Sequence, residues 1–349
     1  MEITLSQLGL LFSFSLAFVG VFTPIVRLLA IRLKVIDLPS EAHKTHQEPV
    51  PYLGGVAIVI GVLFATYGAI VWSKNLDLLS IASAVVLPAV FMGVVGLIDD
   101  IKKLNPWPRF IVQNIVGITI ALILVFTNTL GSPTGNTLLD IVISVFWIVG
   151  ITNSINFFDN VDGGASGAIA IASCFLCILA FQGNQFFIAA LAIVLGGSTI
   201  GFLMWNKPPA RIYMGDAGAL FLGVLVATLT LRFNPNPIDK FSSFAIPLLL
   251  LAIPILDTTV AVLSRLRRRI SPFQGGQDHL SHRLMRAGFS KRNSVLILWL
   301  SSLIFSLSAL LISNVSFSEE KPISATAFVF WMIGLFYFMS TKDDAQLPR

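Results

Sequence analysis

Runs of about twenty uncharged, largely apolar residues recur along the whole 349-residue chain, separated by short polar segments. Each run can cross a bilayer as an α-helix, because a helix rises about 1.5 Å per residue and the hydrocarbon core is about 30 Å thick. The pattern predicts eleven membrane-spanning helices. Their expected bounds are 7–31, 52–72, 79–98, 110–127, 138–157, 165–182, 185–204, 217–233, 242–264, 294–313 and 323–340.

The composition agrees with this pattern. Hydrophobic residues make up 55% of the chain and charged residues 12%, whereas a soluble domain carries about 25% charged residues. The chain contains no internal repeat and no low-complexity tract. We therefore expect an all-α fold, in which residues 1–349 form a single integral-membrane domain built as a polytopic helix bundle.

Basic residues are distributed unequally between the two sides of such a bundle. With the N-terminus outside, all but four of the 23 Lys and Arg fall on the cytoplasmic side, where these residues are normally in excess. We therefore expect an N-out, C-in protein of the plasma (inner) membrane, in which the long polar interval 265–293 is a cytoplasmic substrate loop. The net charge of +5 follows from this bias, so no nucleic-acid partner is expected. The four outer basic residues are Lys74, Arg232, Lys240 and Lys321.

Carboxylates gather at the predicted inner ends of three spans. Asp99 and Asp100 end one span, Asp216 begins another, and the stretch INFFDNVDGG follows a third. The charge rule for topology concerns Lys and Arg, so it does not explain why acids collect on one side. We expect these acids to share one site at the cytoplasmic face.

The third stretch carries its polar residues three apart, at Asn153, Asn156, Asp159 and Asp162. Three residues turn an α-helix by about 300°, so all four side chains cannot share one helical face. The helix end is expected either to tighten towards 3₁₀ geometry or to unwind at Gly163. Either change would direct polar groups into a cleft beyond the last turn.

Grouped carboxylates raise one another's pKa unless a cation lies between them. Asp and Asn oxygens suit a hard divalent cation, and Mg²⁺ typically takes one or two carboxylates together with substrate phosphates. Mg²⁺ is therefore the expected cofactor, with Mn²⁺ as a substitute. Acids for a metal and cations for phosphates together predict phosphoryl transfer. The basic residues expected on this side are Lys44, Lys103, Arg109, Arg265, Arg267 and Arg283.

The histidines allow two interpretations. His279 and His282 are three apart, as are His43 and His46, and this spacing is compatible with a zinc site. Alternatively, the imidazoles, protonated or neutral, donate hydrogen bonds to phosphate groups.

Some acids also have a purely structural interpretation. Asp216 alone could be an ordinary helix cap. Asp257 falls within a predicted span, where an ionisable residue is by default a functional candidate, or it caps a turn loosened by Pro254. A transporter of anionic metabolites is a further alternative, although transporters carry such groups near the midplane and often in repeats.

Five motifs follow one another on the predicted cytoplasmic side. Together they resemble, over nearly the whole chain, the polyprenyl-phosphate N-acetylhexosamine-1-phosphate transferases of glycosyltransferase family 4. The last motif is closer to the undecaprenyl-phosphate GlcNAc-1-phosphate transferase branch than to the related phospho-MurNAc-pentapeptide translocase, which stays the alternative. The motifs are HKTHQEPVPYLGG, GLIDDIKKLNPWPRFIVQ, NSINFFDNVDG, NKPPARIYMGDAGALFLG and SPFQGGQDHLSHRL.

The resemblance implies that undecaprenyl phosphate attacks the β-phosphate of a UDP-sugar, releasing UMP and leaving a lipid-diphosphate sugar in the membrane. GlcNAc-1-phosphate is the expected transferred group, in a first membrane step of cell-envelope polysaccharide synthesis. The implied partners are a UDP-sugar, the polyprenyl phosphate and membrane lipid, and a homodimer is left open.

The resemblance also implies roles for single residues. Asp216 would bind Mg²⁺ with Asn156 or Asp159, while Asp99 would deprotonate or orient the lipid phosphate and Asp100 would help to hold the metal–phosphate assembly. The implied substrate-binding residues are Tyr213 and Asp162 for uracil, Lys44, Lys103 and Asn206 around the diphosphate, His279, His282 and Arg283 lining the pyrophosphate and sugar end, and also Asn153 and Asn156.

Three positions depart from the family's pattern. Lys103 ends the paired-aspartate motif, where some relatives carry a third Asp. Ser281 stands where a histidine is usual in the H-x-H-H motif, and Asn160 stands where a glycine is usual after Asp159. Any role of the missing imidazole must therefore be absent or taken by a hydroxyl group, and the backbone path around Asn160 is open.

Overall fold

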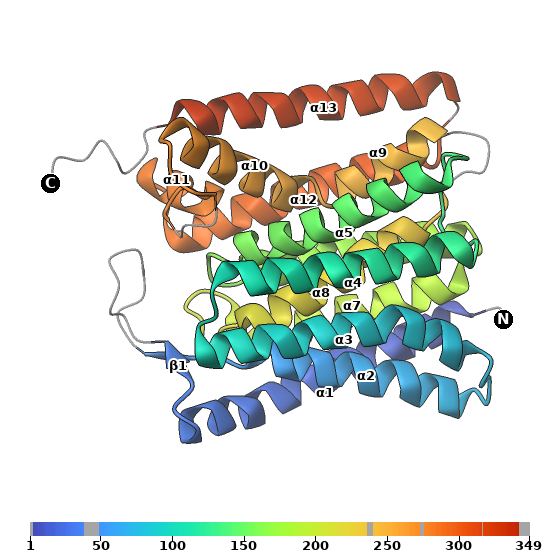
Figure 1. The fold of residues 1–349 in the computed structure, drawn as a ribbon, viewed down its shortest axis with the longest axis horizontal. Coiled ribbons are helices and arrows are strands. Elements are labelled where there is room, and N and C mark those ends of the chain that lie inside the picture. Colours follow the sequence, from blue (N-terminus) through green and yellow to red (C-terminus); the bar gives the residue numbers. More distant parts are fainter. Residues whose placement is uncertain (1–2, 38–48, 236–239, 273–275, 316, 342–349) are drawn as a thin grey trace, which may run out of the picture.

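The computed structural model describes residues 3–37, 49–235, 240–272, 276–315 and 317–341, and this part of the chain forms a bundle of helices (Figure 1). The strands are two residues long and pair antiparallel, with Ile36 opposite Pro51. The elements are α1 (Leu5–Arg32), β1 (Ile36–Asp37), β2 (Val50–Pro51), α2 (Gly54–Trp72), α3 (Leu78–Lys102), α4 (Pro106–Phe126), α5 (Thr137–Phe158), α6 (Gly164–Gln182), α7 (Phe186–Asn206), α8 (Gly215–Arg232), α9 (Lys240–Leu250), α10 (Ala252–Arg267), α11 (Leu280–Arg286), α12 (Lys291–Ile312) and α13 (Phe317–Ser340).

Ten of these helices are long and apolar enough to cross a membrane, and α9 with α10 could form an eleventh, bent crossing. The predicted polytopic helical fold is therefore confirmed. The predicted span 242–264 is not one straight helix, because its two parts meet at an angle of 75°. Leu251 leaves helical geometry at the bend, and Pro254 lies in the first turn of α10, where its missing N–H costs no hydrogen bond.

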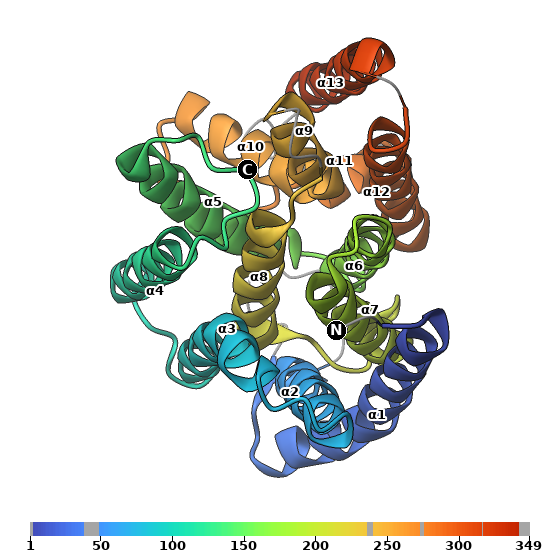
Figure 2. The ribbon, with the colours of Figure 1, turned by 90° about the vertical axis from the view of Figure 1, so that its right-hand side faces the viewer.

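Helix α8 lies near the middle of the bundle, with α2, α3, α5, α6 and α7 arranged about it (Figure 2). In its apolar segment 78% of the residues are buried, against 11% for the segment in the peripheral α13. Gly96 of α3 permits close packing, because a Cβ atom there would lie 2.3 Å from the carbonyl oxygen of Asp216. The start of α8 is thereby placed directly against the last turns of α3.

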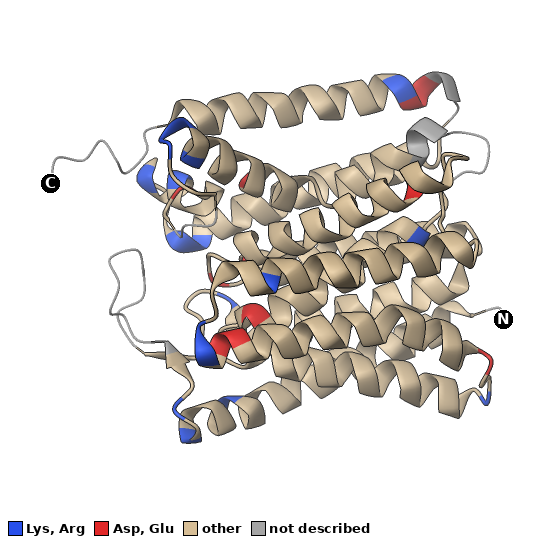
Figure 3. Cartoon of the chain, viewed as in Figure 1, with Lys and Arg blue, Asp and Glu red and all other residues tan. Residues whose placement is uncertain are grey.

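The start of α1 and the end of α13 lie at opposite ends of the bundle (Figure 1). Most described Lys and Arg residues lie at the end where α3 finishes and α11 is found, and acids of α3 and α8 lie just inside it (Figure 3). This distribution is the one on which the N-out, C-in prediction depends; the orientation itself stays a prediction.

Candidate active site

A cavity of about 510 Å³ lies at this basic end, where α3 and α5 finish and α8 begins. It gathers acids from three separate helix ends, as the sequence predicted. Ten predicted site residues line it: Asp99, Asp100, Lys103, Asn156, Asp159, Asp162, Asn206, Tyr213, Asp216 and His282.

Asp100 holds the start of α8. Its carboxylate accepts hydrogen bonds from the backbone N–H groups of Asp216, at 2.9 Å, and Ala217, at 3.1 Å. These N–H groups have no partner within their own helix, so a carboxylate from another helix serves as the cap. Gly215 makes this possible, because its φ of +72° favours glycine and an added Cβ would lie 2.6 Å from the Asp100 carboxylate.

Arg109 joins two of the acids. One of its guanidinium nitrogens donates to Asp99 Oδ2, at 2.5 Å, and to Asp216 Oδ2. The other oxygen of Asp99 accepts from the backbone N–H of Leu104 at 2.6 Å, and the other oxygen of Asp216 accepts from Asn156 Nδ2 at 2.6 Å. Asp99 thus fixes the α3–α4 turn and positions Arg109, and both of its carboxylate oxygens are engaged within the protein.

Asp159 differs from the other acids. It is the residue at which α5 leaves helical geometry, and Gly163, with φ of +73°, immediately precedes the first residue of α6. The helix therefore unwinds here, one of the two predicted outcomes. No hydrogen bond or ion pair within the described residues engages the Asp159 carboxylate. Burial, followed by the charges of Asp216, Asp100 and Asp162, raises the pKa of Asp159 well above its ordinary value.

The donor set fits Mg²⁺ when the ion is completed by substrate. Asp159 offers a carboxylate without a partner, and a cation beside it would relieve the repulsion from neighbouring acids. Asp216 adds a second carboxylate, and Asn156 adds an amide oxygen that makes no hydrogen bond within the described chain. The described residues hold no cluster of three His, Cys, Asp or Glu side chains able to bind an ion alone. Phosphate and water would have to supply the remaining ligands, which is usual for Mg²⁺.

Two predicted substrate-binding residues are engaged within the protein. Asp162 accepts a hydrogen bond of 2.9 Å from the backbone N–H of Ala210 and forms an ion pair of 2.7 Å with Lys291. Asn206, only 2% exposed, accepts from the Gly163 N–H at 3.0 Å and donates to the Ile212 carbonyl at 3.1 Å. Both residues line the cavity, and both also hold the segment between α7 and α8 against the start of α6.

An aromatic pair forms one wall of the cavity. Tyr213 and Tyr52 have ring centroids 6.0 Å apart and planes tilted by 53°, and backbone pairing of Tyr213 N–H with the Pro51 carbonyl at 2.9 Å brings their segments together. Tyr52 was not predicted as a site residue, although it belongs to the first motif, HKTHQEPVPYLGG. Lys103 also lines the cavity and is exposed.

Three predicted substrate-binding residues are not among those that line the cavity. Asn153 donates to Gln113 Oε1 at 2.8 Å within the bundle. The Arg283 guanidinium is buried and donates to carbonyl and hydroxyl groups of α10 and α13, among them the Phe338 carbonyl at 2.6 Å. The third of these residues is His279. Their substrate-binding roles stay predictions that these contacts do not favour.

His279 belongs to a buried polar network. Its Nδ1 donates to Asp257 Oδ2 at 2.7 Å, and its Nε2 accepts from Arg265 at 3.3 Å. Asp257 also accepts from the Leu280 N–H at 2.7 Å, so this intramembrane acid anchors the start of α11, a structural role of the kind the sequence left open. Burial acts to raise the pKa of Asp278, but hydrogen bonds and charge from Arg265 outweigh it and hold that pKa below its ordinary value.

His282 is the histidine that reaches the cavity. Burial, together with the positive charges nearby, lowers its pKa to about 3, so the imidazole is neutral at physiological pH. A protonated His282 is therefore not supported. The zinc alternative is not supported for this pair either, because both ring nitrogens of His279 are already in hydrogen bonds. His43, Lys44 and His46 lie outside the described residues.

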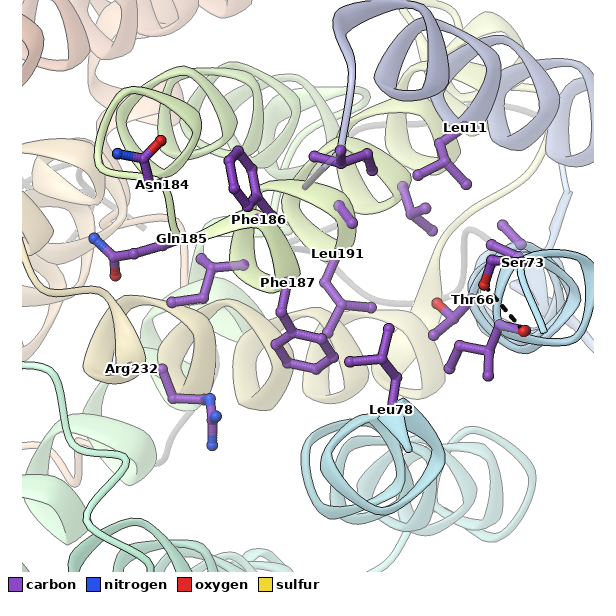
Figure 4. A pocket seen from close by; sticks show the side chains of 17 residues that line it. Leu11, Thr66, Ser73, Leu78, Asn184, Gln185, Phe186, Phe187, Leu191 and Arg232 are labelled. Carbon is purple, nitrogen blue, oxygen red and sulfur yellow. Dashed lines mark hydrogen bonds between the residues drawn. The ribbon is translucent and has the colours of Figure 1, made fainter. Parts of the chain in front are cut away.

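A second cavity, of about 520 Å³, lies at the opposite end of the bundle (Figure 4). Its described lining is mainly apolar, as in Leu191 and Phe187, and includes Arg232 but no acid. Since it lacks the carboxylates that a metal–phosphate site requires, it is not a candidate for the chemistry predicted from the sequence.

Comparisons with known proteins agree with the geometry. Residues 81–234 match the sequence model described as "Glycosyl transferase family 4". The chain is 34% identical over 308 residues, covering 87% of this chain and 84% of the relative, to a Bacillus subtilis protein named "Probable undecaprenyl-phosphate N-acetylglucosaminyl 1-phosphate transferase". It is 30% identical, covering 80% of this chain and 77% of the relative, to the "Decaprenyl-phosphate N-acetylglucosaminephosphotransferase" of Mycobacterium leprae. It is 29% identical to the "Phospho-N-acetylmuramoyl-pentapeptide-transferase" of Lactobacillus helveticus, over 57% of this chain and 66% of the relative.

Proposed function

This chain belongs to glycosyl transferase family 4, and on that premise we propose that it transfers a HexNAc-1-phosphate group from a UDP-sugar to a polyprenyl phosphate. An oxygen of the lipid phosphate attacks the β-phosphorus of the UDP-sugar. The bond between that phosphorus and the bridging oxygen breaks, and UMP leaves. The products are UMP and a lipid-diphosphate sugar.

One observation carries the proposal: five aspartates, from the end of α3, the turn after α5 and the start of α8, line a single cavity. Phosphoryl transfer needs little covalent help from the protein, but it needs positioning and charge neutralisation around the diphosphate. When bound, a divalent cation would supply that neutralisation. Asp159 and Asp216, with Asn156, are the residues that would hold it.

The other cavity residues have roles that follow from their contacts. Arg109 keeps Asp216 in place from one side and Asn156 does so from the other. Lys103, exposed at the end of α3, can pair with a phosphate of either substrate. Tyr213 and Tyr52 offer ring faces for the uracil base, since base–aromatic stacking is sequence-tolerant and worth about 1–3 kcal/mol.

GlcNAc-1-phosphate is the first choice for the transferred group, and undecaprenyl phosphate for the acceptor. Two relatives that cover most of this chain are named for N-acetylglucosamine-phosphate transfer. The relative named for pentapeptide transfer covers 57% of it. The phospho-MurNAc-pentapeptide reaction is therefore the alternative donor specificity.

The test is transfer by the purified protein with undecaprenyl phosphate, MgCl₂ and a panel of UDP-sugars, with UMP release as the common readout. Radiolabelled sugar should appear in the lipid fraction, and UDP-GlcNAc should give the fastest release. Asp216→Asn is the matched inactive control, expected to lose at least about a hundredfold in rate. If no donor yields UMP, the enzyme proposal is wrong, and uptake of unchanged sugar nucleotide by sealed vesicles would favour the transporter alternative.

The proposed location of the active site is the cytoplasmic face of the plasma membrane. The support is the excess of Lys and Arg at the end of the bundle that contains the cavity (Figure 3). Reporter domains fused after the C-terminus should be active only in the cytoplasm. A reporter active only outside would reverse the orientation.

A further inference from the structure

Asn160 connects three segments at the rim of the cavity. Its side-chain nitrogen Nδ2 donates to the Phe157 carbonyl at 2.7 Å and to Asp257 Oδ2 at 3.3 Å. Its oxygen Oδ1 accepts a hydrogen bond of 2.5 Å from Ser281 Oγ. The link therefore runs from α10, through the turn after α5, to α11.

These contacts determine which way the Asn160 amide points. The Phe157 carbonyl and the Asp257 carboxylate can only accept hydrogen bonds, so the atom facing them must be the amide nitrogen. The amide oxygen then faces Ser281. Since that oxygen can only accept, the single hydroxyl proton of Ser281 must point to Asn160.

The direction of the Ser281 hydroxyl also determines which nitrogen of His282 carries the proton. Ser281 Oγ also lies 3.4 Å from His282 Nδ1. Because the Ser281 proton is already committed to Asn160, the serine oxygen can only accept in this second contact. The complementary partner is a protonated Nδ1, which leaves Nε2 of His282 without a proton.

The surroundings keep the imidazole neutral. His282 is 7% exposed. After burial, the charges of Arg286 and Lys291 act against protonation, and Asp278 acts for it. Nε2 makes no hydrogen bond within the part of the chain that the structure describes, although the residue lines the cavity.

We propose that the Asp257–Asn160–Ser281 chain fixes the tautomer of His282, so that Nε2 offers a hydrogen-bond acceptor to an O–H or N–H group of the donor sugar. The inference rests on the proposed function and deepens it. It assigns His282 to the sugar and away from the two phosphates of the UDP-sugar, which carry no proton to donate at neutral pH. Asn160 and Ser281 are positioning residues that act through His282.

The two positioning residues are also two of the three departures from the family pattern. A small residue is replaced by a larger one at 160, and a large residue by a smaller one at 281. The two new side chains are hydrogen-bonded to each other.

The direct test is nitrogen NMR of protein labelled with ¹⁵N-histidine, using His282→Gln to assign the signal. The wild type should show a protonated Nδ1 and an unprotonated Nε2 on this residue. Ser281→Ala should shift it towards a mixture of tautomers, whereas Thr119→Ala, an exposed change on α4, should not. A protonated Nε2 in the wild type, or no change in Ser281→Ala, would overturn the inference.

Kinetics then test the consequence. His282→Gln places an amide oxygen near the position of Nε2 and should keep KM for UDP-GlcNAc within about threefold, whereas His282→Asn should raise KM about tenfold with little change in kcat, a loss of about 1.4 kcal/mol. UDP-sugars that lack one sugar hydroxyl or the amide N–H identify the group that contacts Nε2. The analogue without that group cannot make the contact, so it should bind to the wild type and to His282→Asn with equal affinity. If the His282→Asn substitution raises KM by the same factor for every analogue, His282 does not contact the sugar.

The two proposals fail separately. If UMP release is absent with every donor but NMR shows the protonated Nδ1 and its dependence on Ser281, the proposed function is wrong. The control of the His282 tautomer by Ser281 is then still supported. If transfer occurs but His282 carries its proton on Nε2, only the inference about the His282 tautomer is wrong.

Discussion

Asp100, near the end of α3, accepts a hydrogen bond of 2.9 Å from the backbone N–H of Asp216, the second residue of α8. Two of the predicted catalytic acids are therefore neighbours with different tasks. One carboxylate completes the helix terminus, while the other projects from that terminus into the cavity. The distinction can be measured.

Replacing Asp100 with alanine should remove the cap. The expected cost is about 0.5–2 kcal/mol of unfolding free energy, as for other helix caps, together with a loss of transfer activity because Asp216 is displaced. Asp100→Asn keeps an acceptor oxygen and should retain more of both. Thermal unfolding and UMP release measure the two effects, and an Asp100→Asn protein as inactive as Asp216→Asn would mean that Asp100 binds metal or phosphate directly.

Asp159→Asn should increase the stability of the fold while it lowers transfer activity. A carboxyl group whose pKa is raised in the folded state destabilises the fold at every pH above its ordinary pKa, because unfolding relieves the burial and repulsion. Removing the charge should therefore raise the melting temperature of the metal-free protein at pH 7 to 8, by about 2–4 °C for each kcal/mol gained. Transfer should fall at least about a hundredfold. A lower melting temperature would contradict the unpaired state of this carboxylate.

The metal requirement should depend on pH through the same residue. A protonated carboxyl is a poor ligand, so the Mg²⁺ concentration for half-maximal rate should rise as pH falls through the raised pKa of Asp159 and level off above it. Chelation should abolish transfer, and Mg²⁺ or Mn²⁺ should restore it. Calorimetry of Mg²⁺ binding to the wild type, in buffers of different ionisation enthalpy, should detect the release of a proton. A Mg²⁺ requirement that does not change with pH would contradict the prediction.

Arg109→Ala should leave Asp99 and Asp216 without the cation that joins them. Since the arginine side chain is 19% exposed, we expect a loss of about 1–3 kcal/mol, below the value for a fully buried pair. Arg109→Lys should recover part of it, because it keeps the positive charge but not the guanidinium geometry. Added MgCl₂ should raise the melting temperature more in Arg109→Ala than in wild type; an equal increase would show that the ion binds away from these acids.

Tyr213→Ala should weaken donor binding. Loss of one base–aromatic stack, worth about 1–3 kcal/mol, should raise KM for UDP-GlcNAc by about tenfold or more, while Tyr213→Phe keeps the ring and should stay close to wild type. Tyr67→Phe, a change in α2 that removes a hydroxyl contact of 3.1 Å with Ser83, is the matched control. Competition by UMP should weaken in parallel, and an unchanged UMP inhibition constant would remove Tyr213 from the uracil site.

The sequence predicted the membrane bundle well because hydropathy is a local property. Ten spans agree with single helices, and the exception, 242–264, bends by 75° where Leu251 leaves the helix before Pro254. The apolar run by itself contained the proline but not the bend, since helices also tolerate a proline in the first turn. The bend depends on how the two segments pack.

For the candidate site, the sequence by itself determined which residue types lie at which ends of the helices. It placed Asp99, Asp159 and Asp216 on one side of the membrane, because the distribution of Lys and Arg fixes the expected side of every loop. Only the tertiary structure decided which polar groups remain available to a ligand. Asp100 and Asn206 have their acceptors satisfied by backbone N–H groups far away in the chain, whereas Asp159 has none. Such pairings depend on how helices distant in sequence pack together, and spacing along one helix carries no information about them.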